Sequence, residues 1–328
     1  MNPAAGEASH EASSSRSPGG RDRRPDFLKV RLRVGANFTS VRGVISDLGL
    51  HTVCQEARCP NIYECWQDRA ATFLILGSIC TRNCAYCAVQ SGRPGPADPD
   101  EPRRVAEAVA AFGLEYAVVT SVTRDDLTDG GAGIFAATIR AIHARVPGCR
   151  VEVLVPDFAG NLDAVETVMA AGPEVFNHNI ETVSRLFRVA RPKGSYERSL
   201  SVLRHAAVLS SRFAEHGHGG AAGGMTKPIP VKSGFMVGLG ESEAEIMEVL
   251  RHLRAAGVSI VTIGQYLQPT RRHLPVARYY TPSDFELLRA AAMEMGFTHV
   301  EAGPLVRSSY HARRQFEHTG APGGKGTG

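Results

Sequence analysis

Short apolar runs alternate with longer segments of helical periodicity between residues 71 and 301. This alternation repeats about six times, which predicts an α/β fold with a parallel sheet and helices outside it. No dinucleotide-binding fingerprint follows the first run, so a full or partial β/α barrel is favoured over a doubly wound sheet. We predict strands at 72–76, 116–122, 150–155, 174–180, 231–237, 259–267 and 298–301. We predict helices at 103–112, 134–145, 162–171, 196–215, 243–256 and 283–295, the last capped by Ser283.

Polar residues and one cysteine follow the predicted strands. Because the carboxyl ends of parallel strands meet at one face of the sheet, we expect these residues to form the active site. They are Cys80, Thr123–Asp126, Asn179, Glu181, Gly238–Glu241, Gln265, Tyr266 and Gln268.

The regions outside the repeats differ from them in composition. Residues 1–25 are rich in Ser, Gly, Pro, Ala and Arg, which predicts a disordered tail. Residues 26–70 form an N-terminal extension before the barrel of 71–300, and 301–328 form a C-terminal extension with a flexible tail. The Gly-rich segment 217–224 is predicted to be a flexible surface loop.

Composition and charge narrow the class of protein. With 43% hydrophobic and 21% charged residues among 328, the chain has a globular composition. It has no run of 18 uncharged apolar residues, so we expect no membrane association. A net charge of +4 is too small to indicate a nucleic-acid partner.

Six of the seven cysteines lie within 34 residues. Disulfides in a secreted protein are usually spread along the chain, and no signal peptide pattern opens this one. We therefore predict a cytoplasmic protein whose clustered cysteines bind metal or take part in catalysis.

The clustered cysteines form two groups of three. The group later in the chain, Cys80, Cys84 and Cys87, has the spacing C-x3-C-x2-C directly after the first predicted strand. Three thiolates on one loop suit a 4Fe–4S cluster with one iron left open. Structural zinc usually requires a fourth ligand and paired C-x2-C elements, and only one such pair is present. A thioredoxin-type redox site is the weakest alternative.

The first group, Cys54, Cys59 and Cys65, has the spacing C-x4-C-x5-C in a polar segment. These residues form either a second cluster or three buried structural thiols, and the polar setting favours the cluster. Cys149 precedes a strand, at the opposite end of the sheet from the loop of the other triplet. We therefore expect it to be a structural thiol, and the fourth ligand to be oxygen or nitrogen.

The spacing of Cys80, Cys84 and Cys87, with Tyr86 among them, resembles that of the radical S-adenosylmethionine (SAM) superfamily. More specifically, the chain resembles the lipoyl synthase family from about residue 25 to 316. The motifs that carry this likeness are the ARCPN context of the first triplet, RPDFLKV at 25–31, TSVTRDDLTDGGA at 120–132, HNIETV at 178–183, RLFRVARP at 185–192, GLGE at 238–241 and RSSY at 307–310. Tyr63 and Ala70 depart from the family pattern, where glycine is frequent, and the loop 217–224 looks like an insertion.

The resemblance implies a partial (β/α)6 barrel of the radical SAM type, whose two extensions carry an auxiliary cluster. It implies two 4Fe–4S clusters, with Cys80, Cys84 and Cys87 on the first. Cys54, Cys59 and Cys65 would hold the second, with Ser309 of the RSSY motif as fourth ligand. S-adenosylmethionine would bind the open iron and be cleaved to a 5′-deoxyadenosyl radical.

The resemblance also implies the reaction and its partners. Two sulfur atoms would be inserted at C6 and C8 of an octanoyl group bound to a lysine of a lipoyl carrier protein. We predict that the auxiliary cluster is the sulfur donor. The expected partners are an octanoylated lipoyl domain or the glycine-cleavage H protein, a ferredoxin- or flavodoxin-type electron donor, and an iron–sulfur carrier that rebuilds the cluster.

Four residues are expected to contact S-adenosylmethionine: Tyr86, Asn179, Glu181 and Arg191. Each could instead be a structural hydrogen-bonding residue of the barrel. Arg307 could position a cluster or the substrate, or serve a structural role.

Two alternatives to the expected activity remain. One is another radical SAM sulfur-insertion or peptide-modifying enzyme with an auxiliary cluster, which the RSSY motif and the order of the triplets disfavour. The other is an electron carrier, which would supply four thiolates to each cluster.

Overall fold

A single curved sheet organises the molecule in the computed structural model, which describes residues 24–30, 34–216 and 228–317. The spatial order of its eight strands follows the chain order. The strands are β1 (His51–Thr52), β2 (Thr72–Ile75), β3 (Tyr116–Ser121), β4 (Arg150–Leu154), β5 (Val175–Asn177), β6 (Val231–Val237), β7 (Ile260–Gln265) and β8 (His299–Gly303). From β2 to β8 all neighbours are parallel, whereas β1 pairs antiparallel with β2. Among the described residues β1 and β8 are edges, so the barrel is partial.

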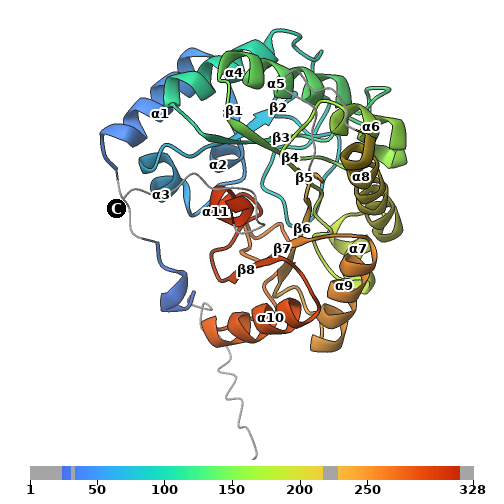
Figure 1. Ribbon diagram of the computed structural model, residues 1–328. Helices are drawn as coiled ribbons and strands as arrows, with labels where there is room; N and C mark the ends of the chain where they lie inside the picture. Colours follow the sequence, from blue (N-terminus) through green and yellow to red (C-terminus); the bar gives the residue numbers. More distant parts are fainter. Residues whose placement is uncertain (1–23, 31–33, 217–227, 318–328) are drawn as a thin grey trace, which may run out of the picture.

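Helices cover the outer face of the sheet (Figure 1). Those of the repeats are α4 (Glu101–Phe112), α5 (Ala132–Arg145), α6 (Leu162–Met169), α7 (Ser184–Ala190), α8 (Tyr196–His216), α9 (Glu243–Ala255) and α10 (Pro282–Glu294). Those of the extensions are α1 (Ala36–Asp47), α2 (Val53–Glu56), α3 (Ile62–Gln67) and α11 (Ala312–Glu317). The 3-10 turns are η1 (Asp26–Leu28) and η2 (Phe158–Gly160). Figure 1 shows α11 in front of the sheet interior, with α2 and α3 beside it.

The sequence explains where the helices begin and end. Helix α4 ends at Gly113, whose φ of 64° is readily reached by glycine. Helix α10 begins one residue earlier than expected, and its cap is Thr281 rather than Ser283. Thr281 and Asp284 form a capping box, so the hydroxyl that accepts a backbone bond comes from the residue just before Pro282.

The apolar core lies between the sheet and its helices, whereas the inner face of the sheet is partly polar. On that face Lys232 of β6 and Glu152 of β4 form a fully buried ion pair with a nitrogen–oxygen distance of 2.8 Å. Tyr116 and Asn177 donate to the same carboxylate. These partners compensate the desolvation of both charges.

The six predicted strand–helix repeats are confirmed, and β8 follows them. The sequence patterns missed β1, α7 and the helices of the two extensions, α1, α2, α3 and α11, and β5 is shorter than predicted. The expected tail, apart from residues 24 and 25, and the loop at 217–224 lie outside the described residues. The divisions at 70/71 and 300/301 stay predictions. No helix in the described part is long and apolar enough to cross a membrane.

Candidate active site

The loop that carries Cys80, Cys84 and Cys87 follows β2 and is bonded to the ends of neighbouring elements. The amide of Thr81 donates to Thr123 O after β3 at 3.0 Å, and that of Ala85 donates to the last residue of α7 at 2.8 Å. The Thr123 amide also donates to the Cys80 sulfur at 3.3 Å. These bonds fix the loop at the carboxyl end of the sheet, where the sequence places it.

An arginine inside the cysteine motif anchors this loop. The Arg82 guanidinium donates to both oxygens of Asp125, at 2.8 and 2.7 Å, and forms an ion pair with Asp157 at 2.7 Å. Asp157 is completely buried and also pairs with Arg198. Burial alone would raise the pKa of Asp157, but the ion pair with Arg82, assisted by the charge of Arg191, holds it below its usual range.

The four expected cofactor-binding residues come together beside Cys84. Burial raises the pKa of Glu181, while the charge of Arg191 and polar contacts from Asn179 and Tyr86 oppose that shift. Arg191 donates to Asn179 O at 3.3 Å, and its Nε is buried without a partner among the described residues. Paired charges with unfilled hydrogen-bonding capacity fit a ligand that has both an amino and a carboxylate group.

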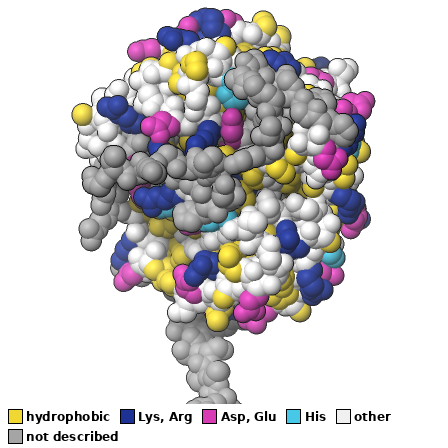
Figure 2. All heavy atoms as spheres, viewed as in Figure 1, with side chains coloured by type: hydrophobic (Ala, Val, Ile, Leu, Met, Phe, Trp, Pro, Cys, Tyr) yellow, Lys and Arg dark blue, Asp and Glu magenta, His cyan; other side chains and the backbone are white. Residues whose placement is uncertain are grey.

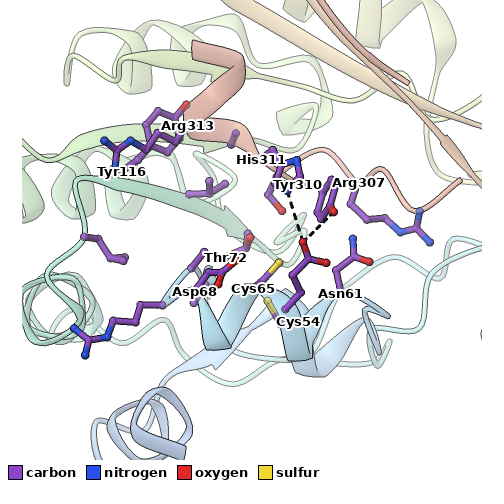
Figure 3. Close-up of a pocket in the computed structure, with 18 of the residues that line it drawn as sticks. Cys54, Asn61, Cys65, Asp68, Thr72, Tyr116, Arg307, Tyr310, His311 and Arg313 are labelled. Atoms are coloured by element: carbon purple, nitrogen blue, oxygen red, sulfur yellow. Dashed lines mark hydrogen bonds and ion pairs between the residues drawn. The ribbon is translucent and has the colours of Figure 1, made fainter. Parts of the chain in front are cut away.

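A cavity of about 560 Å³, away from the loop 80–87, brings together Cys54, Cys59, Cys65 and Ser309. The three cysteines come from α2, α3 and the turn between them, and Ser309 precedes α11. Figure 3 shows the Cys54 and Cys65 sulfurs on the side of these helices that faces the C-terminal segment. Three soft thiols and one hydroxyl on a single cavity fit the donor set expected for the auxiliary cluster.

Two hydrogen bonds join the N-terminal and C-terminal segments around this cavity. The Asn61 amide donates to Leu305 O at 2.8 Å, and Asn61 is 1% exposed. The Tyr310 hydroxyl donates to Glu64 at 3.2 Å, one of the contacts drawn in Figure 3. Residues about 245 positions apart in the sequence are thereby held in contact.

The two serines of the RSSY motif have different surroundings. Ser308 Oγ accepts a hydrogen bond from Asn179 Nδ2 at 2.8 Å. Ser309 lines the cavity, and within the described ranges no hydrogen bond of its hydroxyl is found. Of the two hydroxyl groups, that of Ser309 is therefore the one available to a ligand in the cavity.

Burial dominates the thiol chemistry of both triplets. It raises the pKa of Cys54 to about 11 and that of Cys87 to about 12. It also raises the pKa of Cys59, where the nearby Arg307 opposes the shift. In the part of the chain that the structure describes, all seven cysteines are free, and no three His, Cys, Asp or Glu side chains meet at a spacing that suits a single metal ion.

Comparison with known proteins agrees with this arrangement. A model of the radical SAM superfamily matches residues 74–253, and one of the N-terminal domain of lipoyl synthase matches residues 2–59. A lipoyl synthase from Rubrobacter xylanophilus is 55% identical over 94% of this chain and 91% of its own length. One from Symbiobacterium thermophilum is 54% identical over 89% of this chain and 87% of its own length. The chain belongs to the lipoyl synthase family.

Two solved structures share the fold of this lipoyl synthase family member. HydG, a maturase of the FeFe-hydrogenase, gives a TM-score of 0.51 at 16% identity, over 74% of this chain and 58% of that one. Streptococcus suis SuiB bound to S-adenosylmethionine gives 0.50 at 10% identity, over 76% and 57%. At such identities the likeness concerns the fold alone, which confirms the radical SAM barrel.

Cys149 is kept from the cavity of the first triplet for a different reason from the one expected. The cavity also reaches Thr72 and Tyr116, which begin β2 and β3, so it lies at the same end of the sheet as Cys149. Cys149 nevertheless does not line it, because its side chain is buried in the apolar core at 3% exposure. Its side-chain direction, rather than its end of the sheet, keeps it away.

Some strand-end residues expected in the active site support a loop instead. The side-chain nitrogen of Gln265 donates to Tyr266 O and Arg278 O, and its side-chain oxygen Oε1 accepts from the Tyr280 amide. Tyr266 donates to Leu274 O. They hold the segment between β7 and α10, whose His273 bonds Cys87 O at 2.8 Å. Gln268 belongs to the same group, since it donates to the carbonyl of His273.

Sequence reasoning missed the residues that position the site: Arg82, Asp157, Asn61, Glu64 and Ser308. Only Arg82 had a usable signal, since it lies inside the cysteine motif and an acidic pair follows the next strand. The other four residues act through contacts between segments that are distant in the sequence.

The surface carries mixed charges. Figure 2 shows positive and negative side chains interspersed over the described part of one face, as expected for a net charge of +4.

Proposed function

We propose that this lipoyl synthase family member inserts two sulfur atoms, at C6 and C8, into an octanoyl group bound to a lysine of a lipoyl carrier protein. The observation that carries the proposal is the cavity in which Ser309 meets Cys54, Cys59 and Cys65. A serine beside three cysteines supplies the donor set implied for the auxiliary cluster. The opposite end of the sheet carries the radical SAM motif.

The first site would hold a 4Fe–4S cluster through Cys80, Cys84 and Cys87. Tyr86, Asn179, Glu181 and Arg191 would bind S-adenosylmethionine, with Arg191 facing its carboxylate and Glu181 its amino group or ribose. Arg82 fixes the loop that carries these cysteines. Arg191 and Asn179 are 7% and 9% exposed, and burial of this kind would limit the access of water to a reactive substrate radical.

The second site would hold a second 4Fe–4S cluster through Cys54, Cys59, Cys65 and Ser309. When bound, the two groups would supply a carbon radical that removes hydrogen from an unactivated C–H bond and the sulfur that replaces it. Two S-adenosylmethionine molecules would be used, one for each hydrogen. Ser309 would supply a hard oxygen ligand, which matches iron–sulfur chemistry less well than a thiolate and would be the most easily released of the four ligands.

Partners follow from this chemistry. The carrier would be an octanoylated lipoyl domain or the glycine-cleavage H protein. Reduction of the first cluster requires a one-electron donor of the ferredoxin or flavodoxin type, and loss of sulfur requires an iron–sulfur carrier that rebuilds the second. Seven free thiols among the described residues suit the reducing cytoplasm.

The test is anaerobic reconstitution with an octanoylated carrier peptide, S-adenosylmethionine and a reductant. We expect about eight irons per chain, from two cubanes, and a peptide product that contains two additional sulfur atoms. Ser309→Cys should retain the iron but impair turnover. Wild-type product formation in that variant would contradict the role of Ser309, and deoxyadenosine without sulfur transfer would favour another radical SAM modifying enzyme.

A further inference from the structure

The segment 307–310 is held from two sides. On the barrel side, Asn179 Nδ2 donates to Ser308 Oγ at 2.8 Å. On the other side, the Tyr310 hydroxyl donates to Glu64, the residue before Cys65, at 3.2 Å. Ser309 lies between these two attachments, one peptide unit from each. Its position in the cavity therefore depends on both neighbours.

The barrel-side attachment belongs to the other site. Asn179 follows β5 and is 9% exposed, and its carbonyl accepts from Arg191. Its side chain also makes a polar contact with Glu181, which in turn contacts Tyr86 between two of the loop cysteines. A single chain of polar contacts thus runs from Tyr86 through Glu181 and Asn179 to Ser308.

The fold makes room for this arrangement. A Cβ at Gly234 of β6 would lie 3.0 Å from Asn179 Oδ1 and 2.3 Å from Thr262 Oγ1. Asn179 Oδ1 is buried and has no hydrogen-bond partner in the described part of the chain. The Asn179 amide is therefore fixed by its nitrogen, while its buried oxygen lies against β6 with capacity left for a hydrogen-bond donor.

We propose that Ser308 is a positioning residue that couples the two sites: through Asn179 it holds Ser309 toward the three cysteines, and it also holds Asn179 in place for the cofactor. This inference rests on the proposed function, which assigns Ser309 to the second cluster and Asn179 to S-adenosylmethionine. Because the coupling is thermodynamic, loss of the Ser308 hydroxyl weakens binding at both sites. A single neutral hydrogen bond corresponds to about a twofold to tenfold effect.

The auxiliary side is tested in the full chain with Cys80→Ala, Cys84→Ala and Cys87→Ala, which leaves one triplet for reconstitution. Loss of iron to a chelator is followed by absorbance. Ser308→Ala should speed this loss about twofold to tenfold, whereas Ser308→Thr keeps the hydroxyl and should retain the original rate. Tyr310→Phe removes the other attachment and should also speed the loss.

The cofactor side is tested in the reconstituted protein with all six cysteines. Equilibrium dialysis of labelled S-adenosylmethionine, without reductant, gives its affinity. Ser308→Ala should weaken binding about twofold to tenfold, and Ser308→Thr should not. Tyr310→Phe is the matched control, because its hydroxyl contacts only the auxiliary side and its loss should leave cofactor affinity unchanged.

Asn179→Leu removes the bond from its other end. In the single-triplet background it should reproduce the faster iron loss of Ser308→Ala, and the double variant should add nothing further. This result identifies the Asn179–Ser308 bond as the cause and separates it from a general loss of stability.

The outcomes separate the two levels of the proposal. If the single-triplet background with Ser308 intact takes up no cluster, the proposed function fails at its auxiliary site. If the cluster forms and Ser308→Ala leaves either iron loss or cofactor affinity unchanged, the coupling is overturned. If Tyr310→Phe weakens cofactor binding as strongly as Ser308→Ala, the effect arises from a general destabilisation of the segment 307–310 and not from the Asn179–Ser308 bond, and the coupling is overturned.

Discussion

The two cysteine triplets differ in how the fold holds them. The loop 80–87 is fixed by backbone bonds to the segment after β3 and to the end of α7, and by the buried ion pairs of Arg82. The triplet of Cys54, Cys59 and Cys65 meets its expected fourth ligand where the N-terminal extension contacts the segment 305–311. That contact includes hydrogen bonds from Asn61 and Tyr310 across about 245 residues and an ion pair between His311 and Glu64 at 3.8 Å.

Under the proposed function, this difference would separate generation of the radical from supply of sulfur. A strongly anchored loop suits a cluster that must keep the same geometry through many cycles. A junction held by a few hydrogen bonds and by partly exposed ion pairs, such as His311–Glu64, would suit a cluster that opens and is rebuilt. Variants that affect one triplet and spare the other test whether the two triplets differ in this way.

The largest expected effect comes from deleting one thiol in each triplet. Cys84→Ala should lower cleavage of S-adenosylmethionine by at least about a thousandfold, because the first cluster loses a ligand. Cys59→Ala should abolish sulfur insertion while cleavage to deoxyadenosine continues. Chromatography of deoxyadenosine and mass spectrometry of the carrier peptide measure both. Sulfur insertion by Cys59→Ala would show that the triplets do not have separate roles.

The second effect concerns the anchor of the first loop. Arg82→Met removes one of the two ion-pair partners of the fully buried Asp157 and leaves Arg198. Because the carboxylate is then only partly compensated, the free energy of unfolding should fall by about 3 kcal/mol, the lower end of the range for a broken buried pair. Urea denaturation of the cluster-free protein measures it.

Tyr310→Phe, which removes the auxiliary attachment, is the comparison for Arg82→Met. It should lower the free energy of unfolding by only about 1 kcal/mol. Equal losses in the two variants would remove the contrast between the two anchors.

These anchors also show what the sequence could predict. The loop 80–87 is local: a C-x3-C-x2-C motif after an apolar run predicts its position, because strand, loop and helix are neighbours in the chain. Ser309 came only from the resemblance, since no spacing rule connects it to Cys65. The roles of Asn61, Glu64 and Ser308 depend on tertiary contacts that have no signal in a single sequence. Helix α1, in the N-terminal extension, was also missed.

The third effect is a pH dependence specific to the first site. His178 is 1% exposed, and burial, assisted by the charge of Arg191, lowers its pKa to about 4. The unfolded chain takes up this proton near pH 6.5, so stability should fall as the pH drops from about 6.5 to 4, by at most about 3 kcal/mol. Above pH 7 the residue contributes no slope. The free energy of unfolding between pH 4 and 7 measures the effect.

His178→Asn is the control for that slope, because an amide can still donate to Val155 O, the present partner of the ring. The variant should lose the dependence between pH 4 and 6.5. If its slope equals that of the wild type, the acid sensitivity arises elsewhere, and the two sites do not differ in this respect.

The last effect concerns how closely the C-terminal segment packs on the barrel. A Cβ at Gly264 of β7 would lie 2.3 Å from Val306 O, so Gly264→Ala must displace the segment that leads to Ser309. Overpacking of this kind should lower the free energy of unfolding by about 1–3 kcal/mol and speed iron loss from the second triplet alone. Gly43→Ala in α1, where a Cβ meets nothing within 4 Å, is the matched control and should be neutral or stabilising. If Gly264→Ala loosened the iron of both triplets equally, the junction of the chain ends would not be the separate, weaker element that its hydrogen bonds indicate.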